Sequence, residues 1–312
     1  MHAFLKRLFP GRRAGRAARA LAAGVLGCLL VLAAPARADE SGALYKQGLA
    51  LKSQGKLDEA IAAFEKAVAA NPKHGMAWAS LGHLYKQRQD LPRSVAAYEH
   101  ATQTITKDAV IWANLGMAYY RSNRIDDAAK ALEKSLAING KDPEVHANLG
   151  VIRRKKGQEA LALKHLERAV QLAPDDSTYL NNLGVAYRSA KRLEDAERVL
   201  LRAVAAAPTD AQIQFNLAVV YRRQEEIDKA IPAYERVVEL SAEFAEAWYD
   251  LGFMYKVNHD DEKAAAAFQR YLDLTKGTDP EAAKRVEAEL EALGASKPAP
   301  PATKPKSKRK KR

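Results

Sequence analysis

A leucine–glycine pair recurs along this 312-residue chain with a period of 34 residues and no insertion between copies. The pair stands at five places in one register: Leu81-Gly82, Leu115-Gly116, Leu149-Gly150, Leu183-Gly184 and Leu251-Gly252. Gln47-Gly48 and Leu217-Ala218 fill the two remaining places of the series. A constant period of this length is typical of a solenoid of helical hairpins, in which each repeat buries its apolar face only by stacking on its neighbours.

The register divides the chain into seven units of 34 residues, which are 41–74, 75–108, 109–142, 143–176, 177–210, 211–244 and 245–278. In each unit, positions four, seven, eight and eleven carry mostly apolar groups at the spacing of one face of a helix. Glycine at the eighth position costs a helix about 1 kcal/mol relative to alanine. We therefore expect the glycine where a second helix approaches closely. Acids such as Asp126 and Asp127 then favour the positive end of that second helix.

The repeat resembles the tetratricopeptide repeat, whose signature is W-x2-L-G-x2-Y, then A-x3-F, then P. The matching aromatic residues are Trp78, Trp112 and Trp248 at the fourth position and Tyr85, Tyr119, Tyr187, Tyr221 and Tyr255 at the eleventh. The matching small residues at the twentieth position are Ala60, Ala128, Ala162, Ala196, Ala230 and Ala264, and the closing prolines are Pro72, Pro174 and Pro208. The resemblance covers residues 41–278 and implies an all-α fold, a right-handed α-solenoid of seven helical hairpins. Its departures include His146 and Gln214 at the tryptophan position and Arg153 at the tyrosine position.

The residues after the seventh unit predict a capping helix followed by a tail. Asp279-Pro280-Glu281 has the pattern of a helix start with proline in the first turn. Residues 279–293 are mostly Glu, Lys, Arg and Ala, so this helix would close the apolar end of the stack with a polar face. Residues 294–312 are rich in proline and lysine and are expected to be disordered.

The first 38 residues have the pattern of a targeting segment. Six cations precede an apolar run from Ala20 to Ala34, and small residues at 36 and 38 offer a cleavage site before Asp39. The run is too short for a membrane span. We therefore expect residues 1–38 to be a signal peptide, and the protein to be secreted or periplasmic in a Gram-negative envelope.

A lipoprotein signal is the alternative interpretation of the same segment. Val25-Leu26-Gly27-Cys28 resembles the bacterial acylation motif and contains the only cysteine of the chain. Against this interpretation, the apolar run continues past Cys28, where lipoproteins normally become polar. Ordinary cleavage is the favoured prediction, and lipidation of Cys28 in an outer-membrane lipoprotein stays open.

The net charge of +12 belongs to the two ends of the chain. Residues 1–38 carry seven Lys or Arg and no acid, and residues 294–312 carry eight and no acid. The residues between them carry 35 Lys or Arg against 38 Asp or Glu. The repeats are therefore not a general nucleic-acid binder. The tail ends in five consecutive cations, which predict weak, salt-sensitive contact with an anionic membrane: Lys308, Arg309, Lys310, Lys311 and Arg312.

The face of each first helix opposite the packing stripe predicts the binding site. In tetratricopeptide folds this face lines the concave groove. Its sixth position gives an asparagine ladder of Asn114, Asn148, Asn182 and Asn216, and its ninth an apolar floor of Met117, Val151, Val185, Val219 and Phe253. Its twelfth position gives a basic edge that includes Arg154, Arg188 and Arg222. Because an amide both donates and accepts, the ladder could hold the backbone of an extended peptide, and the arginines could select acidic side chains. The alternatives are local packing for the asparagines and helix-dipole capping for the cations.

Enzymatic interpretations find no support in the sequence. The seven histidines lack metal-site spacing such as H-E-x-x-H, and neither a glycine-rich phosphate loop nor a G-x-S-x-G elbow is present. We predict no catalytic residue, no metal site and no cofactor. The carboxylate clamp of chaperone-type family members, which needs Lys at the fifth and Asn at the ninth position, is also missing.

The sequence therefore predicts a non-enzymatic scaffold that binds an extended protein segment and supports assembly of a cell-envelope complex. The chain resembles envelope proteins that support pili, gliding motility or secretin assembly. Two rivals stay open. One is an outer-membrane tetratricopeptide lipoprotein acylated at Cys28 with a pilotin- or motility-type role. The other is a spacer that its basic tail anchors to an anionic surface.

Overall fold

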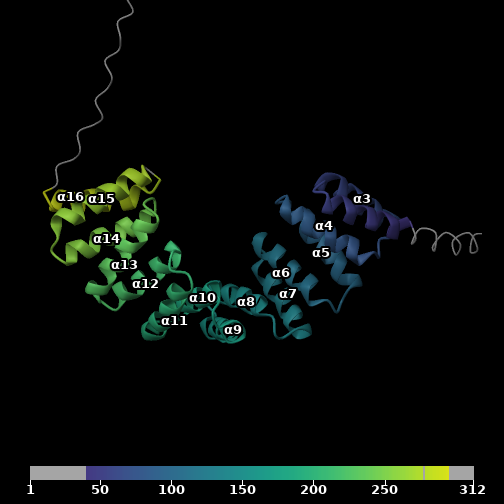
Figure 1. The fold of residues 1–312 in the computed structure, drawn as a ribbon, viewed down its shortest axis with the longest axis horizontal. Coiled ribbons are helices and arrows are strands. Elements are labelled where there is room, and N and C mark those ends of the chain that lie inside the picture. The colour runs from purple at the N-terminus through teal and green to yellow at the C-terminus, as the bar shows by residue number, and fades with distance from the viewer. Residues whose placement is uncertain (1–39, 277, 295–312) are drawn as a thin grey trace, which may run out of the picture. The chain divides into compact units, whose positions relative to one another are not determined.

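The computed structural model describes residues 40–276 and 278–294, and every regular element in this part of the chain is an α-helix (Figure 1). Fifteen helices lie in these residues, one over 40–53 and fourteen labelled α3 to α16, and these residues contain no strand. The predicted all-α fold is confirmed, and the fifteen helices correspond to the seven predicted hairpins and the predicted capping helix. The predictions on Cys28 and on residues 295–312 lie outside the described residues.

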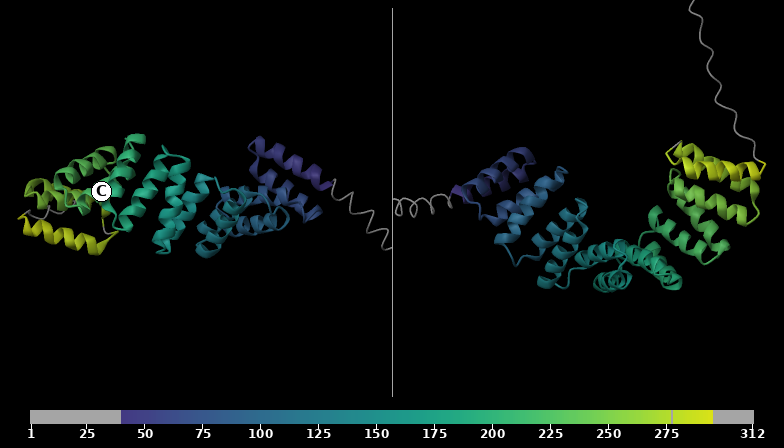
Figure 2. Two further views of the ribbon diagram at one scale, coloured as in Figure 1. Left: turned by 90° about the horizontal axis from the view of Figure 1, so that it is seen from below. Right: turned by 180° about the vertical axis from the view of Figure 1, so that it is seen from behind.

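The chain divides into two compact units, Met1–Lys141 and Asp142–Arg312, which we call the N-terminal and the C-terminal unit. In the N-terminal unit, the helix over 40–53 precedes α3 (Leu57–Ala70), α4 (Gly75–Gln87), α5 (Leu91–Thr104), α6 (Ala109–Arg121) and α7 (Ile125–Ile138). In the C-terminal unit, three hairpins are formed by α8 (Pro143–Lys155), α9 (Glu159–Leu172), α10 (Ser177–Ser189), α11 (Leu193–Ala206), α12 (Ala211–Arg223) and α13 (Ile227–Leu240). The last hairpin and the cap are α14 (Ala245–Val257), α15 (Asp261–Thr275) and α16 (Pro280–Ala292). Figure 2 shows the hairpins of each unit following one another side by side.

The glycine at the eighth position lies where the two helices of a hairpin approach most closely. A Cβ built on Gly184 would lie 2.5 Å from Cγ of Leu200, and one built on Gly252 would lie 2.5 Å from the Phe268 ring. Gly48, Gly82, Gly116 and Gly150 face their second helices at 2.5–2.8 Å in the same way. The close approach expected from the sequence is confirmed, and it explains why the chain accepts the helix-propensity cost of glycine.

Each hairpin turns through one residue in the left-handed backbone region. Gly55 and Gly157 supply glycine there, with φ of 76° and 70°. The equivalent residues of the other hairpins are not glycine and have φ of 59–62°: Gln89, Asn123, Lys191, Glu225 and His259. The turns are therefore sharp enough to reverse the chain, at a cost of roughly 1–2 kcal/mol wherever a Cβ is present.

Side-chain caps fix the starts of the first helices α4, α6, α8, α10 and α12, whereas α14 begins without one. Asp108, Asp142, Asp176 and Asp210 each accept hydrogen bonds from the backbone N–H groups of the helix that follows. The second helices α3, α7, α9, α11 and α13 lack such a cap and instead carry acids in their first turn. Those acids favour the positive end of the helix dipole, as the sequence predicted.

Tyrosines at the eleventh position couple successive hairpins. The hydroxyl of Tyr187 donates a hydrogen bond at 2.8 Å to a carboxylate oxygen of Glu167, which lies on the second helix of the preceding hairpin. Tyr85, Tyr119 and Tyr255 make the same contact at 2.6–2.7 Å with Glu65, Glu99 and Glu235. Burial and the glutamate hydrogen bond raise the pKa of Tyr187 to about 12. Each bond thus joins one hairpin to the next through a buried or half-buried phenol.

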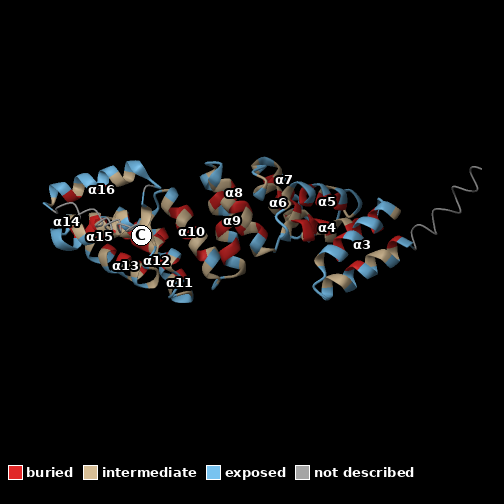
Figure 3. Cartoon of the chain, turned by 90° about the horizontal axis from the view of Figure 1, so that it is seen from above, coloured by how far each residue is buried: buried red, intermediate tan, exposed pale blue. Residues whose placement is uncertain are grey.

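The core of the C-terminal unit is continuous from α8 to the capping helix. One cluster of buried apolar residues includes Ala147 at its start and Val286 and Leu290 of α16 at its end. The side chain of Asp279 accepts from the Ala282 N–H at 3.0 Å and so caps α16. The outer side of α16 is largely exposed (Figure 3). The capping helix predicted from the sequence is confirmed. None of the described helices combines the length and apolar character needed to span a membrane.

Candidate functional site

The predicted binding positions lie on the face of the first helices that the second helices leave uncovered. We call positions two, five, six, nine, twelve and thirteen of the first helices the inner face, which we describe separately for α4 and α6 in the N-terminal unit and for α8, α10, α12 and α14 in the C-terminal unit. Met76 and Val110 at its second position are 46% and 64% exposed. In the C-terminal unit α10 packs against both α8 and α12, so their inner-face residues form one neighbourhood.

The four asparagines of the predicted ladder occupy different environments. Asn148 on α8 and Asn182 on α10 are half-buried, and within the described residues neither amide has a hydrogen-bond partner. Asn114 is also half-buried and accepts a hydrogen bond from Nζ of Lys86 at 3.2 Å. Asn216 is only 6% exposed. The ladder is therefore open at Asn148 and Asn182.

Asn216 is part of an internal hydrogen-bond network. Its Nδ2 donates to Oδ1 of Asn181 at 2.8 Å, and its Oδ1 accepts from a guanidinium nitrogen of Arg188 at 3.4 Å. These bonds occupy the amide and leave it little contact with the surface. Asn216 consequently orients Arg188, whereas a direct contact with a peptide is left to its neighbours.

The apolar positions also divide into surface and core. Met117, Val151, Val185 and Phe253 are half-buried and contribute to the inner face. Val219 is 6% exposed and belongs to the hydrophobic core of the C-terminal unit. The ring of Phe253 packs edge-on against Phe268 at a centroid distance of 5.0 Å, which holds it in place.

The cations at the twelfth position have internal contacts that the sequence did not indicate. Arg222 lies 3.6 Å from the Asp250 carboxylate, and its Nε donates to the hydroxyl of Tyr234 at 3.2 Å. The Tyr234 hydroxyl in turn donates to Asp250 at 2.9 Å. Lys256 pairs with Glu289 of the capping helix. Four of these cations thus reach the next hairpin or the cap: Lys86, Arg188, Arg222 and Lys256.

Electrostatics distinguish the arginines of the C-terminal unit from a simple row of helix-end cations. Burial lowers the pKa of Arg188, and the positive charges of Arg223, Arg154 and Arg222 lower it further. Burial raises the pKa of Asp250, although Arg222 and the Tyr234 hydroxyl act in the opposite direction. The region therefore holds more positive than negative charge.

The fourth hairpin replaces the usual tryptophan contact by a histidine pair. In other hairpins the indole N–H of the fourth-position tryptophan donates to a backbone carbonyl six residues earlier, as Trp112 does to Thr106 at 3.0 Å. Here Nδ1 of His146 lies 3.1 Å from Nδ1 of His165. The two half-buried rings thus pack where the third hairpin has Trp112 and Ala131.

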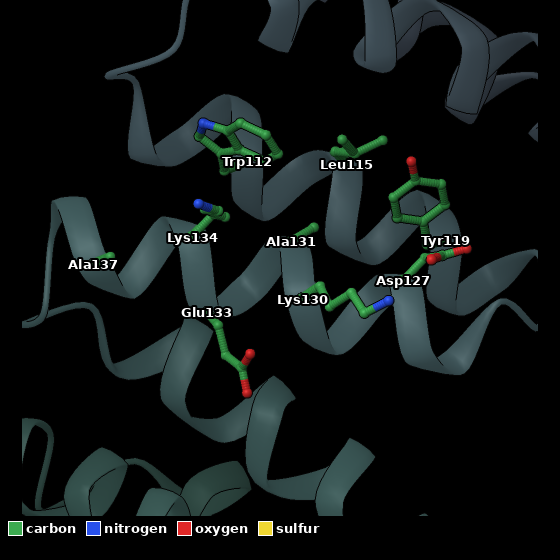
Figure 4. A pocket seen from close by; sticks show the side chains of 9 residues that line it. All are labelled: Trp112, Leu115, Tyr119, Asp127, Lys130, Ala131, Glu133, Lys134 and Ala137. Carbon is green, nitrogen blue, oxygen red and sulfur yellow. The ribbon is translucent and has the colours of Figure 1, made fainter.

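A pocket of about 520 Å³ in the N-terminal unit was not predicted from the sequence. It lies between α6, which contributes Trp112, Leu115 and Tyr119, and α7 (Figure 4). The α7 residues are Asp127, Lys130, Ala131, Glu133, Lys134 and Ala137. Ala131, a small residue opposite a tryptophan, was the signal that could have indicated this space.

Comparisons with known proteins identify the family. The model of the C-terminal domain of cilia and flagella-associated protein 70, a tetratricopeptide repeat domain, matches residues 14–247, and a general tetratricopeptide repeat model matches residues 215–283. This chain belongs to the tetratricopeptide repeat family. No curated protein matches the sequence significantly.

Solved structures show the same fold at low sequence identity. Cut9 with Hcn1, a hetero-tetramer of the APC/C, is similar with a TM-score of 0.61 and 17% identity over 78% of this chain, which covers 48% of that one. This chain therefore spans about half the length of that protein. PilF of Pseudomonas aeruginosa has a TM-score of 0.60 and 20% identity over 69% of this chain and 97% of its own. YrrB, described as a tetratricopeptide repeat protein with an unusual peptide-binding site, has a TM-score of 0.52 and 20% identity over 62% of this chain and 98% of its own.

Proposed function

We propose that this protein is a non-enzymatic scaffold that binds an extended protein segment on the inner face of its first helices. Tetratricopeptide repeat proteins are in general scaffolds for protein–protein interaction, and the similar structures include one described as peptide-binding. The observation that carries the proposal is the pair Asn148 and Asn182. Their amides lie half-buried on two contacting helices and have no hydrogen-bond partner within the described residues.

The spacing of these amides suits an extended chain. Packed helices lie roughly 8–10 Å apart. An extended peptide advances about 3.3 Å per residue, so successive amides would meet about every third peptide unit. Each amide can donate to a peptide carbonyl and accept from a peptide N–H. Val151 and Val185, one turn further along the same helices, would contact the ligand's apolar groups, and Arg154 and Arg188 its acidic side chains.

Binding experiments on two variants test this proposal. Asn148→Ala/Asn182→Ala should lose the proteins that co-purify with the full chain from envelope extracts, while its melting temperature stays within a degree or two. Asn258→Ala removes an exposed asparagine at the end of α14 and is the matched control, which should retain them. A sharp drop in melting temperature of the double variant would instead make the asparagines structural and overturn the proposal.

We further propose that this scaffold works in a Gram-negative cell envelope, where it supports assembly of a complex. The proposal rests on residues 1–38, whose cations, short apolar run and small residues before Asp39 resemble a signal peptide. Mass spectrometry of the mature protein tests it directly. A free N-terminus at Asp39 supports a soluble periplasmic or secreted protein, and an acylated Cys28 supports the lipoprotein alternative with a pilotin- or motility-type role. An uncleaved chain would contradict both.

The basic end of the chain supports a third possibility, a spacer attached to an anionic surface. Residues 308–312 are five consecutive cations, each contributing roughly 1 kcal/mol near an anionic membrane at low salt. Sedimentation with anionic vesicles should then be lost at high salt and on deletion of 304–312. Equal sedimentation of the full and shortened chains would leave the tail without this role.

A further inference from the structure

Four arginines lie close together at one edge of the inner face in the C-terminal unit. Arg154 stands in the last turn of α8, Arg188 in that of α10, and Arg222 and Arg223 in that of α12. Because α10 packs against both α8 and α12, the four guanidinium groups belong to one patch, which we call the arginine cluster. Arg188, at its centre, is half-buried and is affected by the charges of the other three.

The described residues neutralise only part of this charge. Asp250 pairs with Arg222 at 3.6 Å and is itself only 15% exposed in its side chain. Arg188 contacts a neutral amide, Oδ1 of Asn216, at 3.4 Å. The Arg154 side chain forms no hydrogen bond and no ion pair with the described residues; its Nε is buried, so only the terminal nitrogens of the guanidinium are left for a ligand. The cluster therefore lacks acceptors that an anionic ligand could provide.

A helix dipole alone does not explain the arrangement. A cation in the last turn is stabilised by the dipole, and it gains as much when it is exposed and isolated. Partial burial of Arg188 among three like charges opposes that gain. Clusters of arginine that are poorly compensated inside the protein are typical of surfaces that recognise acidic or phosphorylated segments.

We infer that the arginine cluster binds an acidic segment of a partner protein, in which a carboxylate stands at every third residue. The inference rests on the proposed function, because it assumes that the segment lies extended across α8, α10 and α12. In a polyproline II segment, residues three apart point the same way and lie about 9.3 Å apart. That spacing matches the roughly 8–10 Å between packed helices. In a β-strand, side chains on one face recur every second residue, at about 6.6 Å, which does not match.

The two rows of the inner face would then have separate tasks. The open amides of Asn148 and Asn182 would hold the backbone of the segment, and Arg154 and Arg188 would each pair with one carboxylate. Arg222 already holds Asp250, so the exposed guanidinium of Arg223 would receive the third. A guanidinium can form two parallel hydrogen bonds with one carboxylate, which favours this pairing over a diffuse attraction.

Labelled synthetic peptides and the full chain test the inference by fluorescence anisotropy. One peptide carries three glutamates at every third position in a proline–alanine background, and the other carries the same residues with the glutamates contiguous. The spaced peptide should bind at least tenfold more tightly at 50 mM salt, and its affinity should fall at 200 mM salt. Equal affinity of the two peptides would overturn the spacing, and tighter binding of the contiguous peptide would do the same.

Charge-matched variants show whether the cluster is the site. Arg154→Gln/Arg188→Gln should weaken the spaced peptide at least tenfold, whereas Lys164→Gln/Arg168→Gln, which removes two exposed cations of α9, should change its affinity less than twofold. If the arginine double variant fails to fold, Arg223→Gln is the second test, because Arg223 is exposed. It should weaken the peptide about threefold and reduce the salt dependence. An unchanged affinity in Arg223→Gln and in a folded double variant would place the peptide elsewhere.

The outcome is separable from that of the proposed function. If neither peptide binds but natural partners are still lost from Asn148→Ala/Asn182→Ala, the inner face binds protein and only the acidic ligand is wrong. If partners are retained by that variant as well, both proposals fail. If a peptide with a single phosphoserine binds more tightly than the spaced glutamates, one dianionic group fills the cluster and the every-third-residue spacing is wrong.

Discussion

The replacement of Gly184 by alanine should reverse its effect on stability when the side chain opposite is shortened. In the native chain, the new Cβ would lie 2.5 Å from Cγ and 2.8 Å from Cδ2 of the buried Leu200. Overpacking of this kind costs roughly 1–3 kcal/mol, and alanine returns about 1 kcal/mol of helix propensity. We expect Gly184→Ala to destabilise the chain by about 1 kcal/mol. Leu200→Ala alone should cost about 2–5 kcal/mol, because Leu200 is fully buried.

In the Leu200→Ala background the clash disappears and the helix propensity remains. Gly184→Ala should therefore stabilise that background by about 1 kcal/mol, which gives a coupling free energy of about 2 kcal/mol between the two positions. Urea unfolding of the four proteins, followed by circular dichroism, measures the cycle through the shifts of the midpoint. Stabilisation of similar size in both backgrounds would refute the argument that close helix approach requires the glycine. In the sixth hairpin, alanine already stands at the glycine position as Ala218, and Tyr234 stands at the position equivalent to Leu200; both are fully buried.

Three further predictions concern the turn, the tyrosines and the cap. Lys191→Gly should raise the free energy of unfolding by about 0.5–1 kcal/mol in urea titrations, because φ at Lys191 is 59°, and Gly157→Ala should lower it by a similar amount. The pKa of Tyr187 is raised from 10.0 to about 12, so its contribution to stability is complete below pH 10 and is lost as the pH rises to about 12. Tyr187→Phe should consequently flatten the fall of stability over this pH range, and an unchanged slope would contradict the coupling through Glu167. Ending the chain at residue 278 removes α16 and should expose the apolar end of the last hairpin, so light scattering on heating should increase. A soluble shortened chain with the original melting temperature would argue against the role of α16 as a cap.

The fold was well predicted from the sequence because every repeat carries the same residue types at the same positions. A glycine opposite a large side chain, a small residue twelve positions later and acids at the second helix recur in one register, so local propensity and stacking agree. The caps and the close approach at Gly184 follow from that agreement. The fourth hairpin departs from it at two positions, His146 and His165. Their contact could not be predicted, because the register of one helix against the other is needed to bring them together.

The surroundings of the candidate binding residues were predicted less completely, for a physical reason. Helix periodicity indicates which side of a helix a residue occupies, but not which neighbour covers it. Asn216 and Val219 occupy ladder and floor positions, yet Asn181, Arg188 and the core leave them 6% exposed each. The pairing of Arg222 with Asp250 likewise joins two different hairpins. The predictions on Cys28 and on the basic tail remain predictions.

Photo-cross-linking tests most directly whether the inner face binds protein. A photoreactive amino acid replaces Asn182 on α10 or, as the control, the exposed Lys164 on α9, and the full chain is irradiated in the cells that produce it. The proposal predicts that position 182 cross-links to one discrete partner protein, and that the cross-linked peptide of that partner comes from an acidic segment. Position 164 should give no such product. The same partner cross-linked equally from both positions, or from position 164 alone, would contradict it.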